Sequence, residues 1–221
     1  GIELPYETSR MVMPDNDWKV KNIGVKWYPG NTAHMAIGQG YVLTTPLVMA
    51  AFTASVARDE VFTQPTLIHR ANAPTQSHAK IGLTPEQREA LLVGMEAVTT
   101  TGTARVLSNI ASLRVPGVRI AGKTGTAQIP GDKNVAWFIS FAPVENPKIA
   151  IAVAIEGDTA GEEFGGGLYA APVASRIMQE YFKKHPPPPP PPEPVEVIEE
   201  LETDPESSEP TEVALSEETV T

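Results

Sequence analysis

The sequence contains no cysteine, no long apolar run and no clustered histidines. Without cysteine, disulfides and thiolate chemistry are excluded, although the redox compartment stays undecided. No apolar run approaches the ~18 residues that a membrane-spanning helix needs, and no signal peptide is visible. The four histidines, at positions 34, 69, 78 and 185, lack the spacing of metal ligands. We therefore expect no metal site and no cofactor.

Positive charge is also scarce. The chain carries 17 Lys and Arg against 27 Asp and Glu, a net charge of −10. Eleven of the acids lie between Glu193 and Thr221, a stretch that holds no Lys or Arg. Without that stretch, 16 acids face all 17 bases, so the body of the chain is close to neutral. Such a body has no basic surface suited to nucleic acid, and we expect no nucleic-acid partner.

Composition divides the chain into a body and a tail. The 221 residues, 41% of them hydrophobic and 20% charged, have an ordinary globular composition with room for one sizeable core. Seven successive prolines at 186–192 predict a polyproline II segment of roughly 22 Å, at ~3.1 Å per residue. The acidic stretch beyond them lacks aromatic residues and cannot support a core. We expect a folded domain over 1–184 and a Pro-rich, then acidic, disordered tail over 185–221.

Apolar spacing and capping signals predict four helices. Two of them are preceded by a Thr-Pro pair, which supplies an N-cap and a proline at the first helical position. The second pair, Thr84-Pro85, also has a capping-box partner in Gln87. The expected helices cover 46–58, 85–98, 103–109 and 168–184. Residues 1–40 show little periodicity and are interpreted as an irregular surface segment, and 64–70 is interpreted as a short strand.

Three further strands are joined by short links, which predicts an antiparallel meander. They comprise the stretch around Lys123, residues 135–142 and residues 148–156. The third strand alternates by size, with Ile and Val on one face and Ala on the other. Both faces are apolar, so both should be covered, the alanine face by a close-packed helix. The predicted fold class is α+β, an antiparallel sheet packed by helices.

The most informative stretch is residues 121–128, Ala-Gly-Lys-Thr-Gly-Thr-Ala-Gln. On a strand, Lys123 and Gly125 share one face. Thr124 and Thr126 share the other. Glycine inside a strand marks a bulge or a close approach by another backbone or ligand, and a lysine beside two hydroxyls and an open backbone edge could cradle an anion or carboxylate. An exposed edge strand with a gatekeeping lysine is the alternative.

Three stretches, in this order and at this spacing, resemble one known family. They are Trp27-Tyr28-Pro29-Gly30-Asn31 through Gly38-Gln39-Gly40-Tyr41 into Thr44-Thr45-Pro46, then Ala121-Gly122-Lys123-Thr124-Gly125-Thr126-Ala127, and last Ala136-Trp137-Phe138-Ile139-Ser140-Phe141-Ala142-Pro143. Together they resemble the C-terminal part of the transpeptidase domain of class B penicillin-binding proteins, of the elongation type. The resemblance covers about residues 1–184. It implies the serine β-lactamase and penicillin-binding transpeptidase fold, with three of the family's five strands present and the domain incomplete.

Only one of the family's three catalytic motifs is present. The family carries S-x-x-K, S-x-N and K-T-G, and this chain has the third. Residues 1–5 resemble the segment that follows S-x-N, so the nucleophilic serine is expected upstream of Gly1, in the other half of the same domain. Ser77-His78-Ala79-Lys80 matches S-x-x-K literally, but it lies in a polar loop after the Gly-Gln-Gly turn. We do not take Ser77 as the nucleophile, and we expect this chain alone to be inactive.

The resemblance implies a peptidoglycan D,D-transpeptidase that acts in cell-wall synthesis and cell shape, on the periplasmic side of the inner membrane. Its substrate would be a stem peptide ending in D-Ala-D-Ala, and β-lactams would acylate the complete enzyme. Lys123 and Thr126 are the implied catalytic residues, the Thr126 N–H forming half of an oxyanion hole. Thr124 and Gly125 are implied in substrate binding, with Gly125 leaving the strand edge open to an extended ligand.

Two other functions are compatible with the same residues. One is a non-catalytic interaction module of this fold whose acidic stalk recruits a partner. The other is a hydrolase related to serine β-lactamases, although the Trp-Tyr-Pro-Gly and Gly-Gln-Gly segments favour the penicillin-binding side. Gln39 and Tyr41 are interpreted as structural around the Gly-Gln-Gly turn, with contact to the cleft as the alternative. Trp137 and Phe138 are interpreted as core residues rather than ligand contacts.

Overall fold

The computed structural model describes residues 2, 11, 13–61, 65–68, 79–129, 131, 133–157 and 164–186. Its elements in chain order are α1 Asn16–Ile23, α2 Pro29–Ala36, α3 Pro46–Arg58, α4 Pro85–Thr100, α5 Val106–Asn109, the 3-10 helix η1 Ala111–Leu113, β1 Ala121–Ile129, β2 Lys133–Ala142, β3 Ile149–Gly157 and α6 Ala170–Lys184. The chain divides into two units, Gly1–Pro187 and Pro188–Thr221, and every described element lies in the first. None of the described helices is both long and apolar enough to cross a membrane.

The three strands form one antiparallel sheet in the order β1-β2-β3. Lys123 on β1 lies opposite Ile139 on β2, which in turn lies opposite Ala152 on β3. This arrangement confirms the predicted meander and the α+β class. Within the part of the chain that the structure describes, β1 and β3 each have a single strand neighbour, so both are edge strands.

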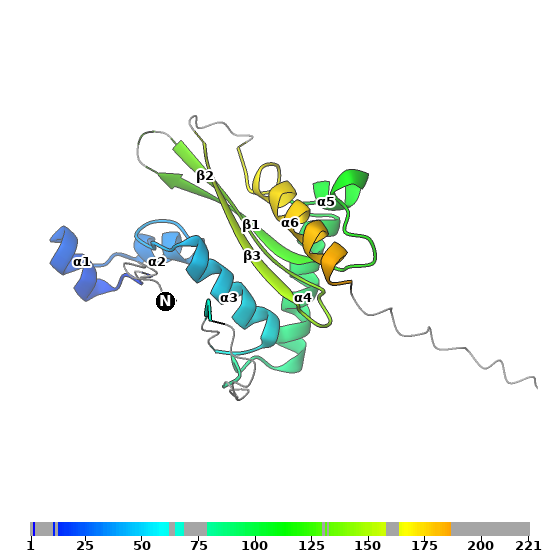
Figure 1. Ribbon diagram of the computed structural model, residues 1–221. Coiled ribbons are helices and arrows are strands. Elements are labelled where there is room, and N and C mark those ends of the chain that lie inside the picture. Colours follow the sequence, from blue (N-terminus) through cyan, green and yellow to red (C-terminus); the bar gives the residue numbers. More distant parts are fainter. Residues whose placement is uncertain are drawn as a thin grey trace, which may run out of the picture. The chain divides into compact units, whose positions relative to one another are not determined.

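Helices cover the two faces of this sheet separately, α6 on one side and α3 on the other (Figure 1). Phe138 and Ile151 are buried with Met178 of α6 in the larger core cluster. On the opposite face, Ala57 of α3 packs in a second cluster with Phe141, and Ala150 packs against it. The size alternation along β3 therefore predicted its packing correctly. Small alanine side chains allow a helix to approach closely, while the branched side chains fill the space beneath α6.

Both Thr-Pro signals predicted real helix starts. Thr45 accepts a hydrogen bond from the Val48 N–H at 3.3 Å, and α3 ends at Arg58 as predicted. At the start of α4 the capping box is complete. Thr84 accepts from the Gln87 N–H at 3.2 Å and its own N–H donates to the Gln87 side chain at 3.0 Å. The predicted helix at 103–109 is helical only from residue 106, and the last helix begins at 170 rather than 168.

The irregular reading of residues 1–40 was wrong, because α1 and α2 lie there. Asp15 caps α1 by accepting a hydrogen bond from the Trp18 N–H at 2.7 Å. Gly24, with φ of +83°, ends this helix in the left-handed conformation that glycine adopts without a steric penalty. Pro29 is the first residue of α2. Both helices are short and most of their residues are exposed, so caps and turns define them and apolar periodicity does not.

The strand predicted at 64–70 is also wrong over the residues that are described there, 65–68. The Thr66 hydroxyl accepts a hydrogen bond from the Ile68 N–H at 3.1 Å. Such a local side-chain bond gives the backbone an alternative to a strand ladder. The rest of that predicted strand, the segment that contains Ser77, and residues 187–221 of the predicted tail lie outside the described residues.

Candidate active site

The edge of β1 that faces away from β2 is lined by the residues of the Lys-Thr-Gly motif. Lys123 Nζ donates to the Thr124 carbonyl at 2.8 Å, and Gln39 Nε2 donates to the Thr126 carbonyl at 3.0 Å. In an antiparallel strand, alternate residues send both backbone groups to the same side. The carbonyls of Thr124 and Thr126 accept from side chains outside the sheet, so they point away from β2. Because both backbone groups of a residue lie on the same side, we infer that the N–H of Thr126 also points to the open edge.

Lys123 is an exposed cation on this edge. Its ammonium group is held close to the backbone by the bond to the Thr124 carbonyl. Among the ion pairs of the described residues, none involves Lys123. Its positive charge is therefore not neutralised by a described acidic side chain and can act on a ligand placed along the strand.

Thr124 and Thr126 lie on the opposite face of the strand from Lys123, as predicted. The Thr124 hydroxyl oxygen is 2.7 Å from the hydroxyl oxygen of Thr103. Thr126 is exposed, and a Cβ added at Gly165 would come within 3.5 Å of its hydroxyl. The sequence reasoning missed Thr103. It sits in a polar turn after α4, and no local pattern indicates that it reaches β1.

Two glycines of the motif have different surroundings. A Cβ at Gly122 would lie 2.6 Å from the Phe138 ring, so core packing alone requires glycine there. At Gly125 an added Cβ would meet the Trp137 Cβ at 3.4 Å and no other atom of the described residues within 4 Å, so their packing leaves room for a small side chain. A Cβ at Gly166 would lie 1.9 Å from the Trp137 carbonyl oxygen. The backbone before α6 therefore lies directly on the sheet at this pair of residues.

Gln39 reaches β1 from the turn that follows α2. Its backbone N–H donates to the His34 carbonyl at 2.9 Å, and its neighbours Gly38 and Gly40 have φ of +75° and +80°. These glycines in the left-handed conformation turn the chain sharply. As a result the Gln39 side chain reaches Thr126 on β1, 87 residues further along the sequence. The Gln39 backbone shapes the Gly-Gln-Gly turn, as the structural interpretation expected, and its side chain contacts the motif strand.

A buried lysine supports the same turn. Lys19 on α1 is only 2% exposed, and its ammonium group donates to Asn31 Oδ1 at 2.7 Å and to the Lys26 carbonyl at 3.0 Å. The same nitrogen lies 4.4 Å from the centre of the Tyr28 ring and 5.7 Å from that of Tyr41. Aromatic faces attract cations electrostatically. Lys19 thus ties α1 to α2 and to the residue two positions after Gln39, a role that no sequence pattern indicated.

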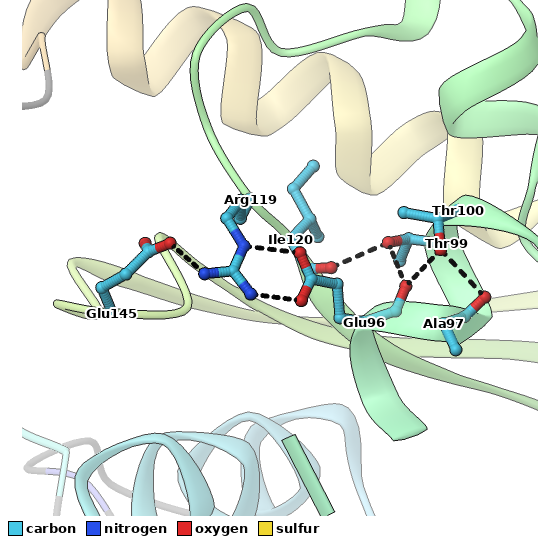
Figure 2. A network of polar contacts seen from close by, with 7 residues as sticks. All are labelled: Glu96, Ala97, Thr99, Thr100, Arg119, Ile120 and Glu145. Carbon is cyan, nitrogen blue, oxygen red and sulfur yellow. Dashed lines mark hydrogen bonds and ion pairs between the residues drawn. The ribbon is translucent and has the colours of Figure 1, made fainter. Parts of the chain in front are cut away.

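A polar network anchors the start of β1 to α4 and to the turn between β2 and β3 (Figure 2). Arg119 donates to both carboxylate oxygens of Glu96, at 2.7 and 2.5 Å, and to Glu145 at 2.7 Å. The bonds from Arg119 lower the pKa of Glu96, and those from Glu96 and Glu145 raise the pKa of Arg119. The Thr99 hydroxyl donates to the carbonyl of Ile120 at 2.8 Å. These bonds fix the backbone just before the motif.

Comparison with known proteins gives consistent matches. The family model described as penicillin binding protein transpeptidase domain matches residues 1–179. A curated relative, peptidoglycan D,D-transpeptidase MrdA of Haemophilus influenzae, is 30% identical over 212 residues, which are 85% of this chain and 31% of the relative. The crystal structure of Pseudomonas aeruginosa PBP2 in complex with WCK 5153 aligns with a TM-score of 0.64 and 33% identity, covering 78% of this chain and 38% of that one.

A third match carries information on chemistry. Penicillin-binding protein A of Mycobacterium tuberculosis, solved as a ceftriaxone acyl-enzyme complex, aligns with a TM-score of 0.53 and 27% identity, over 66% of this chain and 34% of that chain. Across these matches the chain spans about a third of the length of the proteins it resembles.

Proposed function

Because the chain belongs to the penicillin-binding protein transpeptidase domain family, we propose that it forms the Lys-Thr-Gly side of a peptidoglycan D,D-transpeptidase site. The observation that carries this proposal is the geometry of β1. This edge strand presents a lysine without a described acidic partner on one face and two hydroxyls on the other, and its outward carbonyls place the Thr126 N–H on the open edge between them. The nucleophilic serine belongs to polypeptide outside these 221 residues, since the described residues and the matched motifs contain only the third family motif.

The reaction is acyl transfer through a serine ester. The serine oxygen attacks the carbonyl carbon of the penultimate D-Ala of a stem peptide, and the C–N bond to the last D-Ala breaks. That D-Ala leaves as its amine, which takes a proton from the site. An amine of a neighbouring stem peptide then attacks the ester, forms the cross-linking amide and releases the serine hydroxyl.

Each residue of the motif has a defined part in this chemistry. The Thr126 N–H donates to the oxyanion that develops on the attacked carbonyl, a contact that strengthens as charge builds up. The Lys123 ammonium stabilises negative charge beside the serine and near the substrate carboxylate. The hydroxyls of Thr124 and Thr126 donate to that carboxylate, and Gly125 keeps the edge free of a side chain so that the substrate can pair along it.

The same site accounts for inhibition by β-lactams, which would acylate the serine of the complete enzyme. Two further strands would pair with the outer edge of β3, whose only strand neighbour in the described part of the chain is β2. Peptidoglycan lies outside the cytoplasmic membrane, so the site would work on the periplasmic side of the inner membrane.

Replacing Lys123 tests the proposal. In the longer polypeptide, Lys123→Ala should lower the second-order rate constant for acylation by penicillin about a hundredfold, the range seen when one electrostatic contact to the transition state is lost. Lys148→Ala alters an exposed lysine just before β3; it is the matched control and should leave the rate unchanged. Equal acylation rates in Lys123→Ala and wild type would show that the motif lysine does not act in the site, which would contradict the proposal.

A further inference from the structure

Gln39 donates a hydrogen bond to the Thr126 carbonyl, an acceptor on the strand edge along which the substrate would bind. Gln39 Nε2 donates to the Thr126 carbonyl at 3.0 Å, across 87 residues of sequence. Lys123 Nζ occupies the neighbouring outward carbonyl, that of Thr124, at 2.8 Å. Both outward carbonyls of the motif thus have donors from the chain itself. On the described edge the N–H groups of these two threonines make no bond outside the sheet.

Strand geometry shows what a bound peptide would need at this place. In an antiparallel pair, two residues that lie opposite each other in a hydrogen-bonded position exchange both N–H···O bonds. A ligand residue whose carbonyl accepts from the Thr126 N–H therefore directs its own N–H to the Thr126 carbonyl. On the proposed function, on which this inference rests, that ligand residue is the penultimate D-Ala. Its N–H would donate to the Thr126 carbonyl, which already accepts a hydrogen bond from Gln39.

We propose that Gln39 is a displaceable gate on the substrate edge of β1, and that it determines how tightly peptides with an N–H at the penultimate residue bind. Without a ligand, its amide supplies the donor that a bound strand would supply. This protects an open edge, which otherwise pairs with other strands. When a stem peptide binds, its N–H replaces the Gln39 amide at the Thr126 carbonyl.

The structure contains the parts such a gate requires. The Gln39 backbone is fixed by the His34 carbonyl and by the two left-handed glycines beside it, so the side chain starts from a defined position. The side chain itself is exposed to solvent at its contact, and an exposed neutral hydrogen bond contributes little net free energy. A ligand can therefore displace the amide without unfolding the turn.

The first test measures the contact in the 221-residue chain by NMR. Loss of a hydrogen bond moves a carbonyl ¹³C resonance upfield, so Gln39→Ala and Gln39→Glu should both shift the Thr126 carbonyl upfield. The glutamate side chain is as long as that of glutamine but, as a carboxylate, cannot donate a hydrogen bond. Gln39→Glu therefore tests the contact even if Gln39→Ala disturbs the turn. Gln128→Ala, an exposed glutamine on the same strand, is the matched control and should leave the resonance in place. An unshifted Thr126 carbonyl in both Gln39 variants would overturn the proposal.

The second test measures turnover in the longer polypeptide. Two substrates are compared, a stem peptide ending in D-Ala-D-Ala and its depsipeptide, in which an ester oxygen replaces the N–H of the penultimate residue. Gln39→Ala should lower the KM of the amide peptide about two- to tenfold, the worth of one exposed hydrogen bond. It should leave kcat and the KM of the ester unchanged. Lower kcat, or equal changes for both substrates, would show a structural role and overturn the gate. If wild type turns over neither substrate, the proposed function fails while the NMR result still decides whether Gln39 holds this carbonyl.

Discussion

The hydroxyl oxygens of Thr103 and Thr124 lie 2.7 Å apart, although 21 residues separate them in the chain. A hydroxyl that accepts a hydrogen bond from a neighbour keeps its own O–H free to donate to another acceptor. We therefore expect Thr103 to orient the Thr124 hydroxyl toward a bound carboxylate. Thr103→Val should lower kcat/KM for a peptide with a free terminal carboxylate about two- to tenfold. Thr103→Ser should preserve it.

The control for this prediction is Thr101→Val. Thr101 is exposed at the end of α4, where its hydroxyl donates to the Ala97 carbonyl at 3.4 Å. It should behave like wild type. A Thr103→Ser variant as impaired as Thr103→Val would show that the methyl packing matters and the hydroxyl pair does not.

Lys19→Met should destabilise the segment from α1 to the Gly-Gln-Gly turn. The substitution keeps an apolar stem but removes the ammonium donor from the Lys26 carbonyl and from Asn31 Oδ1, which still accepts from the Tyr28 N–H. Losing hydrogen bonds from a buried charged group costs about 2–3 kcal/mol. Hydrogen exchange of the amides in residues 16–41 should rise in Lys19→Met and stay at the wild-type level in Lys21→Met, which alters an exposed lysine two residues further along α1. Equal hydrogen-exchange rates in both variants would show that the contacts of the Lys19 ammonium group do not stabilise this segment.

The Arg119 network should make stability depend on pH in acid. Because Arg119 lowers the pKa of Glu96 in the folded state, its contribution is present above the usual value of 4.5 and is lost as the pH falls below it. Arg119→Gln should reduce the free energy of unfolding by about 1 kcal/mol at pH 7, as expected for an exposed network of ion pairs. Urea denaturation should show this difference shrinking as the pH is lowered below 4.5.

An exposed ion pair on α6 serves as the comparison. Lys183 and Glu180 are paired at 2.5 Å, with about two thirds of each side chain exposed. Lys183→Gln should change the free energy of unfolding less than Arg119→Gln at neutral pH. A difference between wild type and Arg119→Gln that stays constant from pH 7 to pH 3 would exclude the Glu96 carboxylate as its source.

Two buried serines should respond in opposite directions to the same substitution. The Ser140 hydroxyl is fully buried in β2 and has no hydrogen-bond partner among the described residues, whereas the Ser175 hydroxyl in α6 donates to the Leu113 carbonyl. A buried hydroxyl without a partner costs free energy. Ser140→Ala should raise the free energy of unfolding by about 1 kcal/mol, and Ser175→Ala should lower it by about the same amount. Thermal denaturation measures both, and a destabilised Ser140→Ala would mean that this hydroxyl is satisfied in solution.

The sequence predicted those features that local rules determine. Thr45 and Thr84 mark their helices because capping is a contact within four residues, and the size alternation along β3 reports which face each side chain occupies. The motif could be placed on a strand for the same reason, whereas its position at the edge of the sheet is set by the strand order. Contacts between distant segments left no such signal. The Thr103 hydroxyl and the Gln39 amide reach β1 only after the turns that carry them are folded.

Helices without apolar periodicity were also hidden from the sequence. α1 and α2 are stabilised by the Asp15 cap, the left-handed Gly24 and the buried ammonium of Lys19, none of which produces a repeating pattern. A lysine is expected at the surface unless it is paired. Its burial depends on two tyrosine rings and two oxygen acceptors that meet only in the folded structure.

Covalent labelling with a fluorescent penicillin, followed by mass-spectrometric mapping of the modified residue, tests the proposed site most directly. The 221-residue chain alone should stay unlabelled, and a longer polypeptide containing it should be labelled at a serine outside residues 1–221. Lys123→Ala in that longer polypeptide should slow the labelling. Labelling of the 221-residue chain by itself, at Ser77 or at any other of its serines, would contradict the claim that β1 is one wall of a site completed by another segment.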